Sequence, residues 1–230
     1  MMRPRNRRSP RVTRSLVATL LAVLIPTTGC ALLGKGDPVS PAYLTPSPPT
    51  TAASVPLASH RDASVSVAVR LRRVRAADHL GRRVVVRRQG HVVAFLERTR
   101  WTDPPRDLVE RRLARTLYER WGLTRIVGGD GLTLEVTLSA FELDLSDPEH
   151  PHALVEVTGM LHDERRALFQ KTIASKTTTR VPTDDDGMVV PDQAFAEAMS
   201  DALDETLDQL ARSIVDAAEA TDSAVALDDP

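Results

Sequence analysis

An amphipathic stripe near the C-terminal end constrains the fold more than any other feature of this chain. Its large apolar residues recur every three or four positions: Phe195, Met199, Leu203, Leu207, Leu210 and Ile214. This period predicts a helix that begins at Pro191, with one apolar face and an acidic face opposite. Such a helix has to bury its stripe against another element. We expect the stripe to belong to the core, and the alternative is a partner-binding face.

Six predicted strands supply the sheet that this helix needs. Period-two alternation predicts strands over residues 64–72 and 132–145. A hairpin turn at Gln89-Gly90 predicts strands over 83–88 and 91–98, and two more strands, over 153–162 and 167–176, are expected on either side of the turn at 163–166. Within residues 132–145 the alternation changes phase near Ala140 and Phe141, which predicts a β-bulge.

A second helix is predicted between the third and fourth strands. Its apolar face repeats every four residues through Val109, Leu113, Leu117 and Trp121. We expect Asp103 as the N-cap, Pro104 at the first helical position and Gly122 as the C-terminal stop. The resulting order is βββα-βββα. The sequence therefore predicts an α+β fold, with an antiparallel sheet of about six strands and two helices packed on one face.

The N-terminal segment has the pattern of a secretory signal. Six arginines precede an apolar run, Ser15–Ile25, which is too short to span a bilayer. Thr27, Thr28 and Gly29 then lead to Cys30, the one cysteine of the chain. Small residues before a lone cysteine resemble a bacterial lipobox. We therefore expect a signal peptide over residues 1–29, cleavage between Gly29 and Cys30, and acylation of Cys30 as a membrane anchor. The alternative is an incidental cysteine after an ordinary signal peptide.

The segment after the anchor is rich in proline. Residues 30–62 are predicted to form an extended tether, with Tyr43 and Leu44 as an apolar island suited to a short strand or a docking contact. The folded domain is expected over residues 63–218, and residues 219–230 have the composition of a frayed acidic tail.

Charge is distributed unevenly although the net charge is only −1. Residues 61–125 hold 17 basic and 7 acidic side chains, whereas residues 184–230 hold one basic and 14 acidic ones. Asp201, Asp204 and Asp208 on the last helix could therefore meet the arginine-rich segment. That contact could form within one chain or between copies, which would build a homo-oligomer. Aromatic residues make up 3% of the chain, too few for a base-stacking surface, so we expect no nucleic-acid partner.

Catalytic and cofactor motifs are not found in the sequence. It contains no Gly-x-Ser-x-Gly, His-Glu-x-x-His or phosphate-binding loop, so we expect no enzyme activity, no cofactor and no metal site. Trp101, which lies before the first helix, is expected to pack between that helix and the sheet. The alternative is an exposed partner contact, for which Tyr43 and Leu44 are the other candidates.

Several of these features occur together in a known family. The anchor Cys30, Tyr43-Leu44, the Arg-Val-Val-Val-Arg strand at 83–87, Trp101 with Pro104, and the Ala- and Leu-rich last helix resemble the ABC-type transport auxiliary lipoproteins, in particular the PqiC-like group.

The resemblance implies a non-enzymatic role. The domain would be tethered to the outer membrane on its periplasmic face. An aspartate directly after the anchor cysteine resembles an inner-membrane retention signal, and this chain has Ala31 at that position. Its partners would be a protein with MCE (mammalian cell entry) domains and an ABC permease and ATPase, with phospholipid or another lipid as cargo. Two other functions stay open: a structural or assembly lipoprotein of another outer-membrane machine, and an anchored hydrolase.

Overall fold

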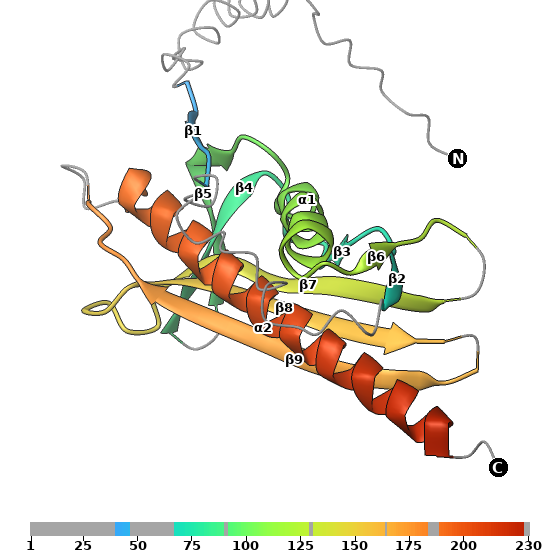
Figure 1. Cartoon of the computed structure of the whole chain (residues 1–230). Helices are drawn as coiled ribbons and strands as arrows, with labels where there is room; N and C mark the ends of the chain where they lie inside the picture. The colour runs from blue at the N-terminus through green and yellow to red at the C-terminus, as the bar shows by residue number, and fades with distance from the viewer. Residues whose placement is uncertain are drawn as a thin grey trace, which may run out of the picture. The chain divides into compact units, whose positions relative to one another are not determined.

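One long strand, β7 (Leu132–Asp144), organises the fold. The structure is a computed structural model, and it describes residues 40–46, 67–89, 92–128, 131–163, 165–183 and 189–227. The predicted signal peptide, Gly29, Cys30 and most of the predicted tether lie outside the described residues. Within them, β7 forms an antiparallel meander with β8 (His152–His162) and β9 (Ala167–Thr178) (Figure 1).

The other edge of β7 is shared by three strands that follow one another along it. They are β2 (Ala68–Leu71), β3 (Arg75–Ala76) and β4 (Arg83–Arg88), and all three pair with β7 in parallel. β4 continues into the antiparallel β5 (Val92–Trp101). The short strands β1 (Ala42–Leu44) and β6 (Thr124–Arg125) pair in parallel with β5 and β2. The described residues thus form a mixed sheet of nine strands.

The expected antiparallel sheet of six strands is wrong in both number and pairing. All six predicted strands form, but β1, β3 and β6 are two or three residues long and too short to show an alternating pattern. The parallel pairs have a topological cause. The chain crosses back through a helix after β5 and then enters β7, so β2, β3 and β4 run in the same direction as β7. The predicted bulge is confirmed by a register shift between Leu138 and Ala140.

The first helix, α1 (Pro105–Arg115), continues into a five-residue π-helical turn, Thr116–Arg120. Gly122 follows with a φ of 67°, which confirms it as the residue that ends the helix. The predicted N-cap is wrong. Pro104 occupies the cap position and Pro105 the first helical position, one residue later than predicted. The proline ring has no acceptor for a side-chain cap, and the Asp103 carboxylate accepts a hydrogen bond from Arg111.

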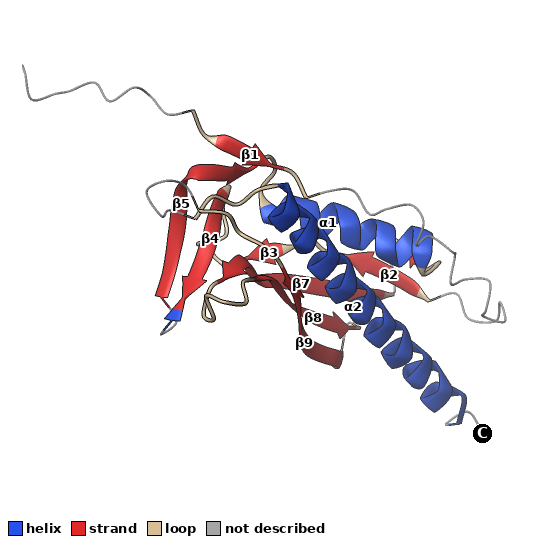
Figure 2. Cartoon of the chain, turned by 90° about the vertical axis from the view of Figure 1, so that its left-hand side faces the viewer, coloured by secondary structure: helices blue, strands red, loops and turns tan. Residues whose placement is uncertain are grey.

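The second helix, α2 (Gln193–Leu227), begins two residues after the predicted Pro191 and extends past residue 218. The Asp192 carboxylate accepts hydrogen bonds from the backbone N–H groups of Ala194 and Phe195, and so caps the helix. Figures 1 and 2 show α2 lying along β8 and β9.

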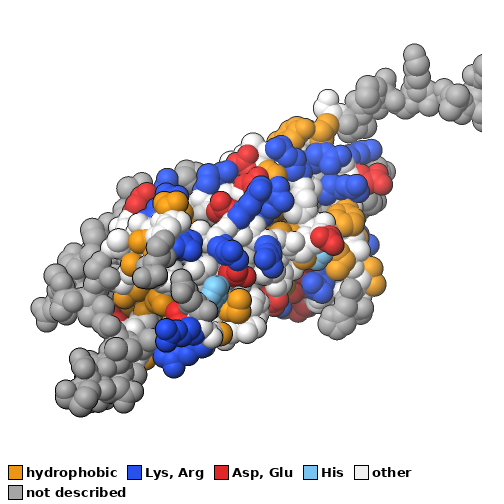
Figure 3. All heavy atoms as spheres, turned by 90° about the vertical axis from the view of Figure 1, so that its right-hand side faces the viewer, with side chains coloured by type: hydrophobic (Ala, Val, Ile, Leu, Met, Phe, Trp, Pro, Cys, Tyr) orange, Lys and Arg blue, Asp and Glu red, His pale blue; other side chains and the backbone are white. Residues whose placement is uncertain are grey.

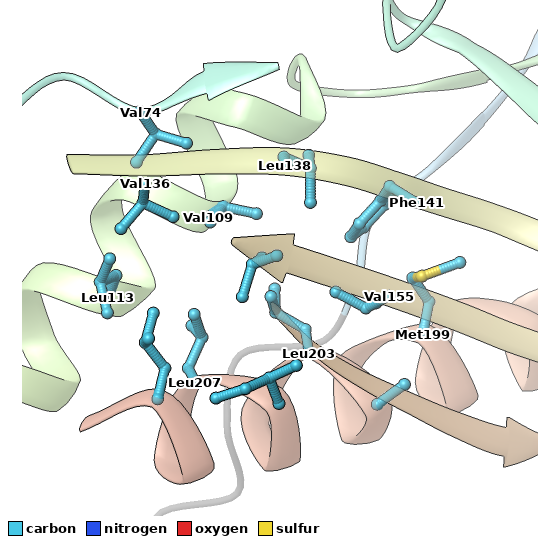
Figure 4. Close-up of a cluster of buried hydrophobic side chains, with 14 of the residues drawn as sticks. Val74, Val109, Leu113, Val136, Leu138, Phe141, Val155, Met199, Leu203 and Leu207 are labelled. Carbon is cyan, nitrogen blue, oxygen red and sulfur yellow. The ribbon is translucent and has the colours of Figure 1, made fainter. Parts of the chain in front are cut away.

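The apolar stripe of α2 is core, as predicted. All six of its members are fully buried: Phe195, Met199, Leu203, Leu207, Leu210 and Ile214. In Figure 4, Leu207 of α2 lies near Leu113 of α1, and Leu203 lies near Val155 of β8. Both helices and the sheet therefore share one core cluster. No described helix is long and apolar enough to cross a membrane.

Candidate functional site

The point at which the anchor segment joins the domain is the first candidate site. β1 adds to the edge of the sheet, with Leu44 opposite Trp101 at the end of β5. The carbonyl oxygen of Leu44 accepts a hydrogen bond from the N–H of Thr102 at 2.9 Å, and the hydroxyls of Thr45 and Thr102 lie 2.7 Å apart. The apolar island is therefore a short strand built into the domain, one of the two roles predicted for it.

Arg112 ties this junction to both helices. It is 7% exposed, and its guanidinium donates hydrogen bonds to Ser200 Oγ at 2.7 Å and Asp204 Oδ1 at 3.0 Å, both on α2. A further hydrogen bond, of 3.3 Å, reaches the carbonyl oxygen of Pro46, two residues after the end of β1. One buried cation thus holds α1, α2 and the segment after β1 together.

Trp101 lies in the core beneath this junction. It is 1% exposed, and its ring meets Phe141 edge-on at 5.1 Å and Phe195 at 5.6 Å between centroids. The role of an exposed partner contact is therefore wrong for Trp101. Its ring packs against the sheet, as predicted, but the helix residue whose ring it meets is Phe195 of α2 and not a residue of the first helix. Leu44 is likewise buried, so Tyr43, at 59% exposure, is the one predicted contact residue that faces solvent.

A pocket of about 260 Å³ opens beside the junction. Its wall combines apolar side chains, Leu108 and Pro105 among them, with the guanidinium groups of Arg111, Arg112 and Arg115. Arg111 already pairs with Asp103, and Arg115 lies 3.7 Å from Glu119, so the cations at the mouth are partly neutralised.

The acidic face of α2 is engaged within the chain. Asp204 pairs with Arg112, and Asp208 pairs with Arg120 at 2.6 Å. Burial raises the pKa of Asp204, against the opposing effect of Arg112. The intramolecular alternative for the charge asymmetry is therefore confirmed at these two aspartates. Asp201 is exposed.

Two buried carboxylates lie on one strand, at Glu142 and Asp144 of β7. Glu142 is bonded to Arg87, and this hydrogen bond raises the pKa of the arginine. Burial alone would raise the pKa of Asp144, but hydrogen bonds from Lys176 Nζ at 2.8 Å and from Ser146 outweigh it and lower that pKa to about 2. Both carboxylates lie in ion pairs that connect β7 to other strands of the sheet, which suits a structural role.

No group of three or more His, Cys, Asp or Glu side chains in the described segments is placed to hold a metal ion. The apolar face predicted for this helix did not include Arg112, so its buried role was missed. The spacing could have indicated that Arg112 is buried, because it lies three residues after the buried Val109 and one before the buried Leu113.

Comparison with solved structures supports the fold. Protein XCC0632 from Xanthomonas campestris superposes with a TM-score of 0.58 at 19% identity, over 80% of this chain and 98% of that one. A second crystal structure, of an uncharacterized protein, gives a TM-score of 0.55 at 13% identity, over 76% of this chain and 99% of that one. At these identities the likeness concerns the fold alone.

The sequence itself carries the assignment to a family. No match was found among curated proteins. The family model for the ABC-type transport auxiliary lipoprotein component matches residues 46–214, which include β2 to β9, α1 and most of α2. The chain therefore belongs to the family of ABC-type transport auxiliary lipoprotein components.

Proposed function

We propose that this protein is a non-enzymatic auxiliary lipoprotein of an ABC transport system that moves lipid through an MCE-domain protein. The family match over residues 46–214 carries the proposal, because it names both an ABC-type system and a lipoprotein. Acylated Cys30 would hold the protein in the outer membrane, with the domain on the periplasmic face. Two or three acyl chains give a stable anchor, whereas one alone binds weakly and reversibly.

The junction at β1 supports an anchored role. The strand lies close in sequence to Cys30 and is fixed to the sheet edge by backbone hydrogen bonds and by Arg112. A force that pulls on the anchor would therefore be transmitted to the folded sheet. Holding a domain on a tether raises its concentration near a partner in the same compartment.

Mass spectrometry of the mature protein and membrane fractionation test the anchor. We expect the mature N-terminus to be an acylated Cys30, and Cys30→Ala to leave an uncleaved or soluble form. Ser9→Ala, elsewhere in the signal segment, is the control and should process normally. An unmodified mature N-terminus at another residue would contradict the lipoprotein assignment.

Affinity purification from membranes tests the transport role. The tagged protein should retain an MCE-domain protein together with the permease and ATPase of an ABC transporter. Recovery of a different outer-membrane assembly in their place would favour the alternative of an assembly lipoprotein.

A further inference from the structure

A group of arginines that are exposed or half-buried lies beside the strand that leads to the anchor. Arg83, Arg98 and Arg100, together with Tyr43, are named here the arginine rim. Tyr43 of β1 is opposite Arg100 of β5, and Arg100 is opposite Arg83 of β4, so the three share one face of the sheet edge. Arg98 is exposed and lies two residues before the half-buried Arg100 on β5. Figure 3 shows one face of the molecule, on which Lys and Arg side chains are numerous and Asp and Glu side chains are scattered among them.

The charge of the rim is not neutralised locally. Among the described residues, no carboxylate lies in an ion pair with Arg83, Arg98 or Arg100. The acidic groups nearest in sequence are the exposed Glu97 and Asp103, and Asp103 is already bonded to Arg111. The rim therefore carries a net positive charge directed at solvent.

Aromatic surface accompanies this charge. The ring of Tyr43 is mostly exposed, and Phe95 of β5 is 41% exposed. The guanidinium of Arg83 lies over the Phe95 ring, 5.3 Å from its centroid. Tyrosine rings are enriched at the boundary between lipid headgroups and acyl chains, and arginines beside them bind anionic headgroups.

The chain length between anchor and rim limits how far the rim can lie from a membrane. Eleven residues, 31–41, separate Cys30 from Ala42, the first residue of β1. Even a fully extended chain of that length spans only about 40 Å. Because β1 is fixed to the sheet beside the rim, the length of this link also limits the distance between the rim and the membrane.

We propose that the arginine rim lies against the surface of an anionic lipid bilayer and orients the domain on its membrane. The inference rests on the proposed acylation of Cys30, which brings the rim to the bilayer. Positive charge, an exposed tyrosine and a short link together favour this occupant. An acidic protein partner would need the charge but neither the aromatic ring nor proximity to the anchor.

Vesicle co-sedimentation tests the rim without the anchor or the transporter. Residues 40–230 form one compact unit with its own core, so the chain from residue 30 carrying Cys30→Ser is a suitable protein. We expect it to bind vesicles in which about one lipid in three is the anionic phosphatidylglycerol. It should not bind vesicles of pure phosphatidylcholine. Binding should weaken strongly at about 1 M NaCl, where the Debye length is only about 3 Å.

The triple variant Arg83→Gln, Arg98→Gln, Arg100→Gln should bind the anionic vesicles roughly 100-fold more weakly, since each basic residue at such a surface contributes about fivefold. The matched control removes three exposed charges at the far end of the sheet: Arg165→Gln, Arg166→Gln and Lys171→Gln. We expect the control to lose much less affinity. Equal losses in the two variants, or no binding by the parent protein, would overturn the proposal.

Tyr43→Trp gives a second readout that keeps every arginine. Its fluorescence should be quenched by vesicles with brominated acyl chains, while the native Trp101 and Trp121 are buried and supply a constant background. An unquenched Trp at position 43 on vesicle-bound protein would also overturn the proposal. Loss of vesicle binding with acylated Cys30 intact would refute the rim alone and leave the proposed function standing.

Discussion

Replacing Arg112 with methionine would remove the charge that joins α1 and α2 while keeping an apolar stem of similar length. The change takes away the donor to Ser200 Oγ and the partner of Asp204. Breaking a buried ion pair costs about 3–5 kcal/mol. The Asp204 side chain keeps 32% exposure, so water can solvate it in part and the lower end of that range applies. We expect the free energy of unfolding to fall by about 3 kcal/mol and Tm by roughly 6–12 °C.

Arg111→Met is the matched control, one residue away on the same helix. Arg111 pairs with Asp103, and both side chains are about half exposed, at 58% and 49%. An exposed pair contributes only about 0–1 kcal/mol, so this variant should stay close to the parent protein. Chemical denaturation of the three proteins measures the differences. Equal stability of the two variants would refute the argument that Arg112 stabilises the fold through its buried contacts.

The pH dependence of Arg112→Met gives an independent check of its cause. Burial raises the pKa of Asp204, and Arg112 opposes that rise, so the pKa should climb further in the variant. A carboxyl group whose pKa is higher in the folded than in the unfolded state favours folding when it is protonated. The stability deficit of the variant should therefore shrink as the pH falls from 7 towards 4. Adding Asp204→Asn should recover part of the deficit at pH 7, and a deficit unchanged by either step would contradict this mechanism.

Two further predictions concern the core and the sheet. Leu207→Asp places an unpaired charge at a fully buried position and should destabilise the domain by about 4 kcal/mol or more in thermal melts. Asp201→Asn on the exposed face is the control and should have little effect. A stable Leu207→Asp protein would contradict a core role for the stripe. Asp144, with its pKa lowered to about 2, should contribute about 2 kcal/mol of stability that is present above pH 4 and is lost as the pH falls towards 2. Asp144→Asn should abolish that acid-dependent step in urea titrations, and an unchanged step would assign it to other carboxylates.

Regular periodicity made the long elements predictable from the sequence. The six predicted strand segments and the two helical stripes all correspond to observed elements, because each is long enough to carry a pattern of buried apolar residues. Strands as short as β3 and β6 lack such a pattern and form because β7 and β2 offer them backbone partners. Their pairing depends on contacts between distant parts of the chain, which no local window of sequence contains.

Buried charges were the harder part of the site to predict. Glu142 and Arg112 have residue types that are nearly always exposed, and periodicity alone does not show that each will find a partner in the core. Glu142 is buried because Arg87, 55 positions earlier, reaches it across the β4–β7 pair. Arg112 is buried because Asp204, 92 positions later, comes to face it from α2. Such pairs follow from the topology and not from local spacing.

The arginine excess of residues 61–125 divides into two groups with different consequences. Arg112 and Arg120 pair with aspartates of α2, so part of the charge asymmetry stabilises the domain from within. Arg83, Arg98 and Arg100 are not in ion pairs with any carboxylate of the described segments, and they border the strand that leads to the anchor. An arginine without a carboxylate partner adds little to folding stability. Substitution in the second group should therefore leave Tm nearly unchanged while altering binding, whereas substitution in the first group should lower Tm.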